Sequence, residues 1–211
     1  MKTMIAIPCM DTVQTEFAQS LVNMKTVGEV QYAFLACSLI YKSRNDLADM
    51  AVKAGADFIL WLDSDVIFPN SLMVDLMADM KDGVDLVTGI YHMRRPPFKP
   101  VIWKKLRQGL IPQENESEDW DDYPKDDVFE IDGCGFGCVL MRTEMLQPIV
   151  DRYHDLFGPV PGYGEDLSFC VRARSCGFKL IADPKIQVGH KGSLIISDES
   201  FEAYRKAGGK T

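Results

Sequence analysis

The sequence lacks any long hydrophobic run. No apolar stretch in its 211 residues approaches the roughly 20 residues that a membrane-spanning helix requires. The start, residues 1–8, resembles a short strand and is too short for a secretory signal peptide. We therefore expect a cytoplasmic protein without a transmembrane segment.

Cysteine is sparse. Six cysteines are scattered along the chain, which is not the density of a disulfide scaffold, so we expect reduced thiols packed as small hydrophobic side chains. Cys134 and Cys138 form a C-x3-C pair, but no second Cys or His pair lies near them in sequence to complete a structural zinc site. Buried packing is the preferred interpretation of this pair.

The chain also lacks an excess of basic residues. Its formal net charge is -8, which argues against broad, nonspecific nucleic-acid binding, because such binding needs a basic surface. An anionic small molecule is not excluded. Much of the acidic excess falls in one polar segment, at Glu114, Glu116, Glu118, Asp119, Asp121, Asp122, Asp126 and Asp127.

What the sequence does contain is an alternation of strand-like and helix-like segments. Strands are predicted over residues 3–8, 30–37, 58–62 and 85–91, and helices over residues 15–24, 43–54 and 70–80. This alternation implies parallel strands joined by right-handed crossovers. With 46% hydrophobic residues, the chain suffices for one sizeable core and not for two. We predict a single α/β domain with a mostly parallel central sheet flanked by helices, in which residues 1–91 form a nucleotide-binding half.

The second half, residues 92–190, is less regular. The run Arg94-Arg-Pro-Pro97 cannot form a regular helix. Its two arginines either contact a donor phosphate or the acceptor or are ordinary exposed residues, and they are not counted among the predicted site residues. A short strand near residues 101–103 precedes an acidic segment, about residues 106–127, which we predict to be mobile and which is either a functional lid or a solvated insertion. Regular structure then returns, with strands over 128–131 and 138–142, a helix from residue 143 and a C-terminal tail over 191–211.

The most informative motif is an acid pair that follows the most hydrophobic predicted strand. Asp63 and Asp65, separated by Ser64, come directly after residues 58–62. Carboxylates at such a place need a positive partner, and ligands of open α/β sheets collect at the carboxyl ends of the strands. Hard oxygen ligands suit Mg²⁺ or Mn²⁺ carrying a phosphate. The alternative is that Asp65 or Asn70 simply caps the next helix.

Glu165 and Asp166 form a second acid pair, just before a predicted helix over residues 167–175. One interpretation is ordinary pairing of acids with a helix N-terminus. The other is general base catalysis, in which one carboxylate takes a proton from an acceptor hydroxyl and the other orients the group. His190 ends the last predicted strand, and it is either an ordinary surface or core histidine or a metal ligand beside the first acid pair.

These motifs, taken in their order along the chain, resemble those of a GT-A-fold glycosyltransferase of the family-2 type. The resemblance is to the compact form of small microbial and bacteriophage members. The resemblance covers roughly residues 4–190 and implies a single GT-A-like, Rossmann-like domain, which in a bacteriophage-encoded member would act in the host cytoplasm. Its pieces are Ile5-Ala-Ile-Pro8, Ser43-Arg-Asn-Asp-Leu-Ala48, the D-x-D motif Asp63-Ser-Asp65, the glycine loop Gly133 to Gly137, Gly164-Glu-Asp166 and His190.

The resemblance implies a role for each matching residue. Asp65 would bind a Mn²⁺ or Mg²⁺ ion that bridges the phosphates of a nucleoside diphosphate sugar, Asp63 would face the ribose or the metal, and His190 would complete the metal's ligands. Asp166 would be the catalytic base, with Glu165 as its alternative. The remaining donor contacts would come from Pro8, Asp11, Arg44, Asn45 and Ser64. The chemistry agrees, since a bound cation neutralises the charge of a diphosphate leaving group.

Two other functions stay open from the sequence alone. A nucleotidyltransferase also uses acid pairs and metals, although Pro8-Cys-Met-Asp11 lacks the basic residues that such enzymes place after the first strand. The second alternative is a non-catalytic nucleotide-binding or partner-binding protein on the same fold. The expected donor is a nucleotide sugar, most simply a UDP-sugar, and the acceptor is an unidentified hydroxyl compound.

Overall fold

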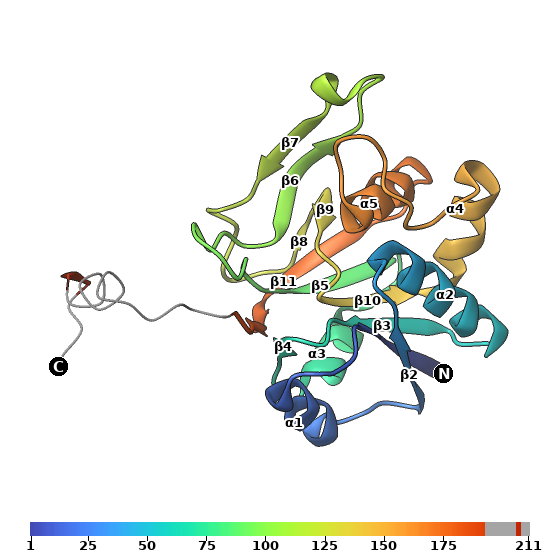
Figure 1. The fold of residues 1–211 in the computed structure, drawn as a ribbon, viewed down its shortest axis with the longest axis vertical. Coiled ribbons are helices and arrows are strands. Elements are labelled where there is room, and N and C mark those ends of the chain that lie inside the picture. The colour runs from blue at the N-terminus through green and yellow to red at the C-terminus, as the bar shows by residue number, and fades with distance from the viewer. Residues whose placement is uncertain (193–205, 208–211) are drawn as a thin grey trace.

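A computed structural model describes residues 1–192 and 206–207 of the chain. Its centre is a seven-stranded sheet (Figure 1). In sheet order the strands are β2 (Glu29–Ala36), β1 (Lys2–Cys9), β3 (Phe58–Leu62), β10 (Cys138–Arg142), β5 (Leu86–Ile90), β11 (Leu180–Gln187) and β8 (Phe129–Glu130). The pairings make five of these strands run one way, with β10 and β8 opposed. The predicted mostly parallel sheet is confirmed.

Helices cover both faces of this sheet (Figure 1). α2 (Ile40–Lys53), α4 (Leu146–Tyr153) and α5 (Glu165–Ser175) lie on one face, and α1 (Thr15–Asn23) and α3 (Leu72–Asp79) lie on the other. The sheet has a hydrophobic core on each face, and successive β3 residues point into opposite cores. Trp61 packs in the cluster with α2 and α5, whereas Leu60 packs in the cluster with α1 and α3. A sheet buried on both faces explains why its strands are continuous hydrophobic runs.

β10 departs from the predicted parallel connections. Its bounds are those that the sequence predicts, but it enters the sheet between β3 and β5 and pairs antiparallel with both. The chain between β5 and β10 contains no α-helix, only a 3-10 helix of three residues. Parallel neighbours need a crossover connection, usually a helix, whereas a chain without one can return in the opposite direction.

The acidic segment forms part of a three-stranded sheet that stands away from the central sheet at the top of Figure 1. β6 (Ile102–Arg107) lies between β7 (Glu116–Asp119) and β9 (Gly133–Cys134), with a short 3-10 helix at Pro112–Glu114 in the β6–β7 connection. Lysines of β6 pair with acids of β7, as Lys105 does with Glu116 and Lys104 with Glu118. The segment's charge is thus partly balanced locally, while its mobility stays a prediction.

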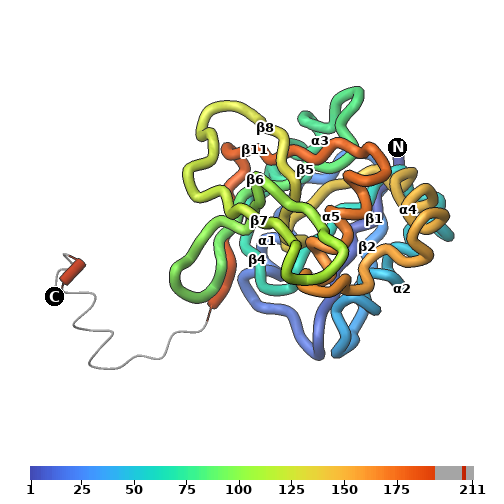
Figure 2. Tube along the Cα trace, turned by 90° about the horizontal axis from the view of Figure 1, so that it is seen from above, coloured from blue at the N-terminus to red at the C-terminus, as the bar shows by residue number. Residues whose placement is uncertain are grey.

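Two short elements complete the described chain. β12 (Gly189–His190) pairs antiparallel with β4 (Val66–Ile67), the strand that follows the D-x-D motif. Figures 1 and 2 both show the end of β12 on the opposite side of the molecule from the N-terminus. No helix among the described residues is long and apolar enough to cross a bilayer. All cysteines are free, and Cys134 and Cys138 are buried.

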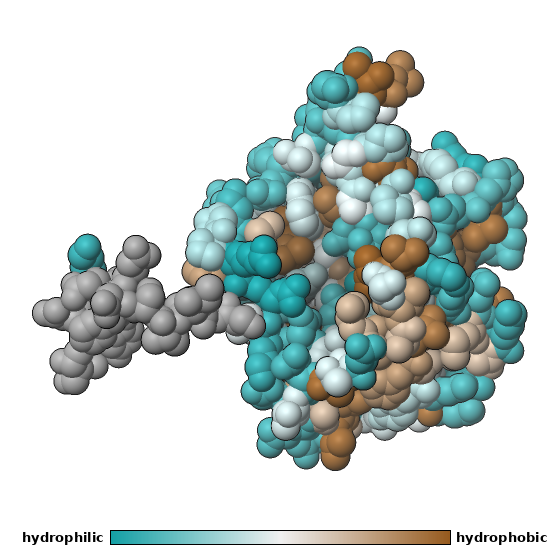
Figure 3. Space-filling view, viewed as in Figure 1, coloured by the Kyte–Doolittle hydropathy of each residue, from teal (hydrophilic) through white to brown (hydrophobic). Residues whose placement is uncertain are grey.

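β2 is an edge strand with an unusual surface. Tyr32 and Phe34 lie beside Ile5 and Ile7 of β1 in register, yet their side chains are about half exposed, 44% and 49%. Leu39 and Ile40 at the start of α2 are also exposed. Figure 3 shows hydrophobic surface over this part of the molecule.

Candidate active site

Asp63 and Asp65 lie in a turn at the carboxyl end of β3. The backbone N–H of Asp63 donates to the carbonyl oxygen of Gly137 (3.1 Å), and the N–H of Val66 donates to the carbonyl of Asp63 (3.3 Å). The next helix, α3, begins only after β4 and has Ser71 at its N-cap. Asp65 therefore does not cap a helix, and neither does Asn70.

His190 reaches Asp65 because β12 pairs with β4. His190 lies opposite Val66, and its Nε2 is 3.6 Å from Oδ1 of Asp65. The other ring nitrogen, Nδ1, contacts the carbonyl oxygen of His92 at 2.8 Å. A carbonyl can only accept, so Nδ1 carries the proton, and the lone pair of a neutral ring is left on Nε2, facing the carboxylate. Metal-binding histidines are commonly oriented in this way.

Opposing effects act on the pKa values of this pair. Partial burial lowers the pKa of His190, but its contacts with Asp65 and the His92 carbonyl outweigh this and leave the pKa raised. For Asp65, partial burial raises the pKa, but His190 and Arg94 lower it by more than burial raises it. The net pKa of Asp65 therefore lies below its ordinary value. Asp65 thus stays negative, as a ligand of a divalent cation must, and a cation that binds Nε2 of His190 has to replace the proton that the raised pKa favours there.

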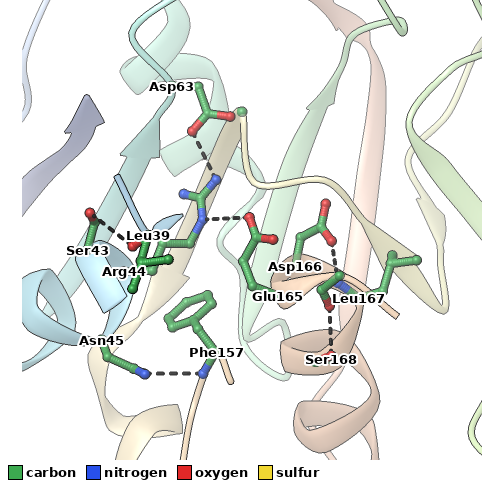
Figure 4. Close-up of polar contacts among 12 residues, drawn as sticks. Leu39, Ser43, Arg44, Asn45, Asp63, Phe157, Glu165, Asp166, Leu167 and Ser168 are labelled. Carbon is green, nitrogen blue, oxygen red and sulfur yellow. Dashed lines mark hydrogen bonds and ion pairs between the residues drawn. The ribbon is translucent and has the colours of Figure 1, made fainter. Parts of the chain in front are cut away.

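Arg44 links the two acid motifs (Figure 4). Its Nη2 donates to Oδ1 of Asp63 at 2.9 Å, and its Nε lies 3.5 Å from Oε1 of Glu165. The side chain is only 2% exposed and lies over the rings of Trp61 and Phe136. An arginine taken out of water needs such partners, so Arg44 fixes the positions of Asp63 and Glu165 relative to each other.

Asp166 stands beside Glu165 at the start of α5, but outside the Arg44 contacts (Figure 4). One of its oxygens, Oδ1, accepts the backbone N–H of Leu167 at 2.7 Å. Removal from water and the neighbouring Glu165 raise the pKa of Asp166 to about 6, against the lowering effect of the Leu167 N–H and of Arg44. A carboxyl with a pKa near 6 is better matched to accepting a proton at neutral pH than an ordinary aspartate.

A cavity of about 340 Å³ gathers most of the predicted site. The predicted residues that line it are Pro8, Arg44, Asp63, Ser64, Asp65, Glu165 and His190. They come from β1, α2, the β3 end, α5 and β12, and the cavity opens at the carboxyl ends of the parallel strands, where ligands of α/β sheets bind. Larger cavities of about 810 and 720 Å³ elsewhere contain none of the predicted residues.

Two predicted donor contacts lie outside this cavity lining. Asp11 is exposed in the loop between β1 and α1. Asn45 follows Arg44 on α2, but its amide donates to Oδ1 of Asp155 (3.0 Å) and accepts the N–H of Phe157 (3.2 Å). It thereby anchors the loop that carries Phe157 under the site, and its contact with a nucleotide stays a prediction.

The glycine loop 133–137 makes room for a protein side chain. A methyl group on Gly135 would lie 2.0 Å from the hydroxyl of Tyr91, and one on Gly137 would lie 2.9 Å from the ring. The Tyr91 hydroxyl also accepts the N–H of Gly137 at 3.2 Å. The sequence suggested a tight turn or a close ligand here, and the structure shows close packing against Tyr91 at these two positions.

Sequence reasoning considered Arg94 as a contact of donor phosphate or acceptor, but it missed the contacts that the loop between β5 and β6 makes with His190 and Asp65. Tyr91 packs edge-on against the ring of His190, with centroids 5.4 Å apart, and the carbonyl of His92 orients the same ring. Arg94 donates from Nη1 to Oδ2 of Asp65 at 2.5 Å. The basic run at 94–95 was the available signal, but the partner of Arg94 lies 29 positions away in sequence.

The residues of this site fit a cation that is bound partly by protein side chains and partly by the phosphates of a substrate. The described part of the chain contains no cluster of three or more His, Cys, Asp or Glu side chains that could hold a metal. Asp65 and His190 offer one carboxylate and one imidazole nitrogen. Magnesium is usually bound by one or two carboxylates together with substrate phosphates rather than by a complete protein cage. These two side chains are therefore compatible with Mg²⁺ or Mn²⁺ that arrives with a phosphorylated ligand.

No protein-family model matches the sequence, and no curated protein sequence matches it. Among solved structures, A197 from STIV superposes with a TM-score of 0.63 at 19% identity, over 93% of this chain and 97% of that one. GalNAc-T7, crystallised with UDP, GalNAc and Mn²⁺, gives 0.61 at 12% identity. Residues 1–349 of S. aureus TarS, in complex with UDP-GlcNAc, give 0.57 at 14% identity.

The fold is GT-A-like. Alignment with GalNAc-T7 covers 92% of this chain and 43% of that protein, and alignment with TarS covers 98% and 65%. At such low identities the likeness shows the fold alone. The predicted GT-A-like domain is confirmed, whereas membership of family 2 and the roles of individual residues remain predictions.

Proposed function

We propose that the protein is a metal-dependent glycosyltransferase of the family-2 type, which moves a sugar from a nucleoside diphosphate sugar, UDP-linked in the simplest case, to a hydroxyl acceptor. The observation that carries the proposal is the cavity in which Asp65 and His190 meet the Asp63–Arg44–Glu165 chain. Two proteins with this fold hold UDP or UDP-GlcNAc, one of them together with Mn²⁺, which supports a donor of the same class.

Asp65 and His190 would hold Mn²⁺ or Mg²⁺ together with the donor's phosphates. The cation would neutralise the negative charge that develops on the diphosphate as it leaves. Asp63, fixed by Arg44, would face the ribose or the cation, while Pro8 and Ser64 would line the nucleoside side of the cavity. Residues 1–91 would thus supply most of the donor site.

Asp166 would take the proton of the acceptor hydroxyl. Glu165 is the other candidate, but its carboxylate is engaged by Arg44. Asp166 has a raised pKa, and among residues 1–192 it accepts a hydrogen bond only from the backbone N–H of Leu167. Residues 92–190 would accordingly supply the acceptor side, and the β6–β7 hairpin is the part of that half that could act as a lid.

A thermal-shift screen tests the donor class. The purified protein is heated with UDP, GDP, CDP or ADP in the presence of Mn²⁺, Mg²⁺ or EDTA. A ligand at about 100 times its Kd contributes about 2.7 kcal/mol to native stability, so one diphosphate should raise Tm by several degrees with metal and not with EDTA. The Asp65→Ala variant should lose the shift. Absence of any shift at millimolar nucleotide would contradict the proposal.

Product analysis separates transfer from the other chemistry. A glycosyltransferase releases a nucleoside diphosphate from the donor, and slow hydrolysis to the free sugar and UDP is measurable without knowing the acceptor. Release of pyrophosphate from a nucleoside triphosphate would indicate a nucleotidyltransferase. Binding without any turnover would indicate a binding protein on this fold.

A further inference from the structure

Arg94 occupies one side of the carboxylate that the proposed cation needs. Its Nη1 donates to Oδ2 of Asp65, while the other oxygen of Asp65 faces Nε2 of His190. Asp65 is mostly buried, with 20% of its side chain exposed, but Arg94 is 53% exposed. The guanidinium thus supplies positive charge at the cation's carboxylate ligand, from a side chain that is free to move into solvent.

The loop that carries Arg94 contacts both proposed metal ligands. Val101 N–H donates to the carbonyl of Tyr91 (2.9 Å), and Met93 N–H donates to the carbonyl of Lys99 (2.9 Å), so the two ends of the loop are held together. From this loop the His92 carbonyl binds the ring of His190 and Arg94 binds Asp65. The loop is therefore in direct contact with both side chains between which the proposed cation would bind.

Arg94 also joins the donor cavity to a basic one. A second cavity, of about 250 Å³, is lined by Gln14, Asp65, Arg94, Arg95 and Lys191. Both cavities share Asp65 and Arg94. Lys191 is held by Glu16 at 2.6 Å, whereas Arg95 makes no ion pair with any residue among 1–192. In a chain of net charge -8, such a group of cations beside Asp65 is suited to an oxyanion.

We propose that Arg94 is an exchange residue. It neutralises Asp65 when no cation is bound, is displaced from the carboxylate when Mn²⁺ or Mg²⁺ binds, and then pairs with the diphosphate that the cation brings. This inference rests on the proposed function, because it assigns the diphosphate of the donor as the second partner of Arg94. Arg94 is a positioning residue in this scheme, and it takes no part in proton transfer.

The physical reason is the cost of an unpaired charge. Asp65 is too buried to lose all positive partners without penalty, so either the guanidinium or the cation must be present. An ion pair with a half-exposed arginine is weak, so a divalent cation can displace it. The released guanidinium matches phosphate oxygens with two parallel hydrogen bonds. Cation and diphosphate should therefore bind cooperatively, with Arg94 as the link.

The test starts with Mn²⁺ alone. Free Mn²⁺ is titrated by electron paramagnetic resonance against the wild-type protein, Arg94→Ala and Arg95→Ala, without nucleotide. Arg95→Ala is the matched control, because it removes the same charge one position away but breaks no contact with Asp65. Arg94→Ala should bind Mn²⁺ about fivefold or more tightly than wild type, since the cation no longer competes with the guanidinium, and Arg95→Ala should change the affinity less than about twofold.

The second measurement is UDP binding by calorimetry at saturating Mn²⁺. Arg94→Ala should bind UDP about tenfold more weakly than wild type, because the diphosphate loses its guanidinium partner. Arg94→Lys keeps the charge but lacks the paired donors, and it should fall between the two. The opposite directions for Mn²⁺ and UDP cannot come from partial unfolding, which would weaken both.

The outcomes separate this inference from the proposed function. If the wild type binds neither Mn²⁺ nor UDP with Mn²⁺, the metal-dependent function fails and the exchange fails with it. If the wild type binds both, and Arg94→Ala binds Mn²⁺ no more tightly than Arg95→Ala does, the exchange is overturned and the function stands. Unchanged UDP affinity in Arg94→Ala would likewise overturn the role of Arg94 at the diphosphate.

Discussion

At the scale of single residues, the pKa of Asp166 makes the proposed chemistry measurable. With a pKa of about 6, Asp166 is ionised above that pH and protonated below it. As the base, it must be ionised, so kcat/KM should rise with pH along a limb centred near 6 and level off above pH 7. The pH profile of donor hydrolysis or transfer checks this, and Asp166→Asn should lower the plateau by about 10²–10⁴-fold.

Glu165→Gln provides the control for that profile. The Glu165 carboxylate is one cause of the raised pKa of Asp166, so removing its charge should move the limb to lower pH while activity is largely kept. A limb that does not move in Glu165→Gln, or one that persists in Asp166→Asn, would assign the titration to another group. UDP affinity should stay near the wild-type value in both variants.

Gly135 is a second residue whose substitution has a definite expected cost. Gly135→Ala would place a methyl group 2.0 Å from the Tyr91 hydroxyl and should destabilise the protein by about 1–3 kcal/mol in urea unfolding. Tyr91→Phe removes the hydroxyl and its hydrogen bond with Gly137, at a cost of about 1 kcal/mol. The double variant should lose about 1 kcal/mol less stability than the two single losses added together, since the clash with the hydroxyl is removed while the 2.7 Å contact with Cγ1 of Val101 remains. If the stability losses of the two single variants simply add up in the double variant, the alanine at position 135 does not contact the Tyr91 hydroxyl.

At the scale of elements, α3 and β11 place two acidic side chains, Asp79 and Asp183, next to each other. Partial burial and the contact with Asp183 raise the pKa of Asp79 to about 6. In the unfolded chain Asp79 titrates near 4, so the native state is penalised above pH 6 and the penalty disappears as the pH falls towards 4. Asp79→Asn should therefore raise Tm by about 1–2 °C at pH 8 and leave it unchanged at pH 4. Equal effects at both pH values would contradict the pairing.

Elements were predicted well where their signal is local. The apolar runs of β3 and β10 end at charged residues, so their bounds could be predicted to the residue. The direction of β10 could not, because it depends on how the chain between β5 and β10 returns to the sheet. Likewise, the sequence places Asp63, Asp65 and Glu165 at element ends, but only the fold shows that Arg44 joins Asp63 to Glu165, 121 positions away in sequence from Arg44.

At the scale of the whole molecule, we expect the central sheet to fold without a bound metal. The two buried clusters are built from hydrophobic side chains, and the part of the chain that the structure describes contains no group of three metal-binding side chains. EDTA should therefore leave the Tm and the circular dichroism of the nucleotide-free protein unchanged, within about 1 °C, whereas a protein with a structural metal unfolds when chelated. Loss of secondary structure in EDTA would refute this.

The pairing of β12 with β4 also sets an order in time. During synthesis the ribosome delivers Asp65 early, and all seven strands of the central sheet are available once Gln187 has emerged. His190 comes after them, and it joins Asp65 only when β12 docks on β4. A nascent chain that stops at residue 188 thus contains all strands of the sheet while still lacking half of the proposed cation-binding pair. The second ligand of the proposed cation is therefore synthesised only after every strand of the central sheet.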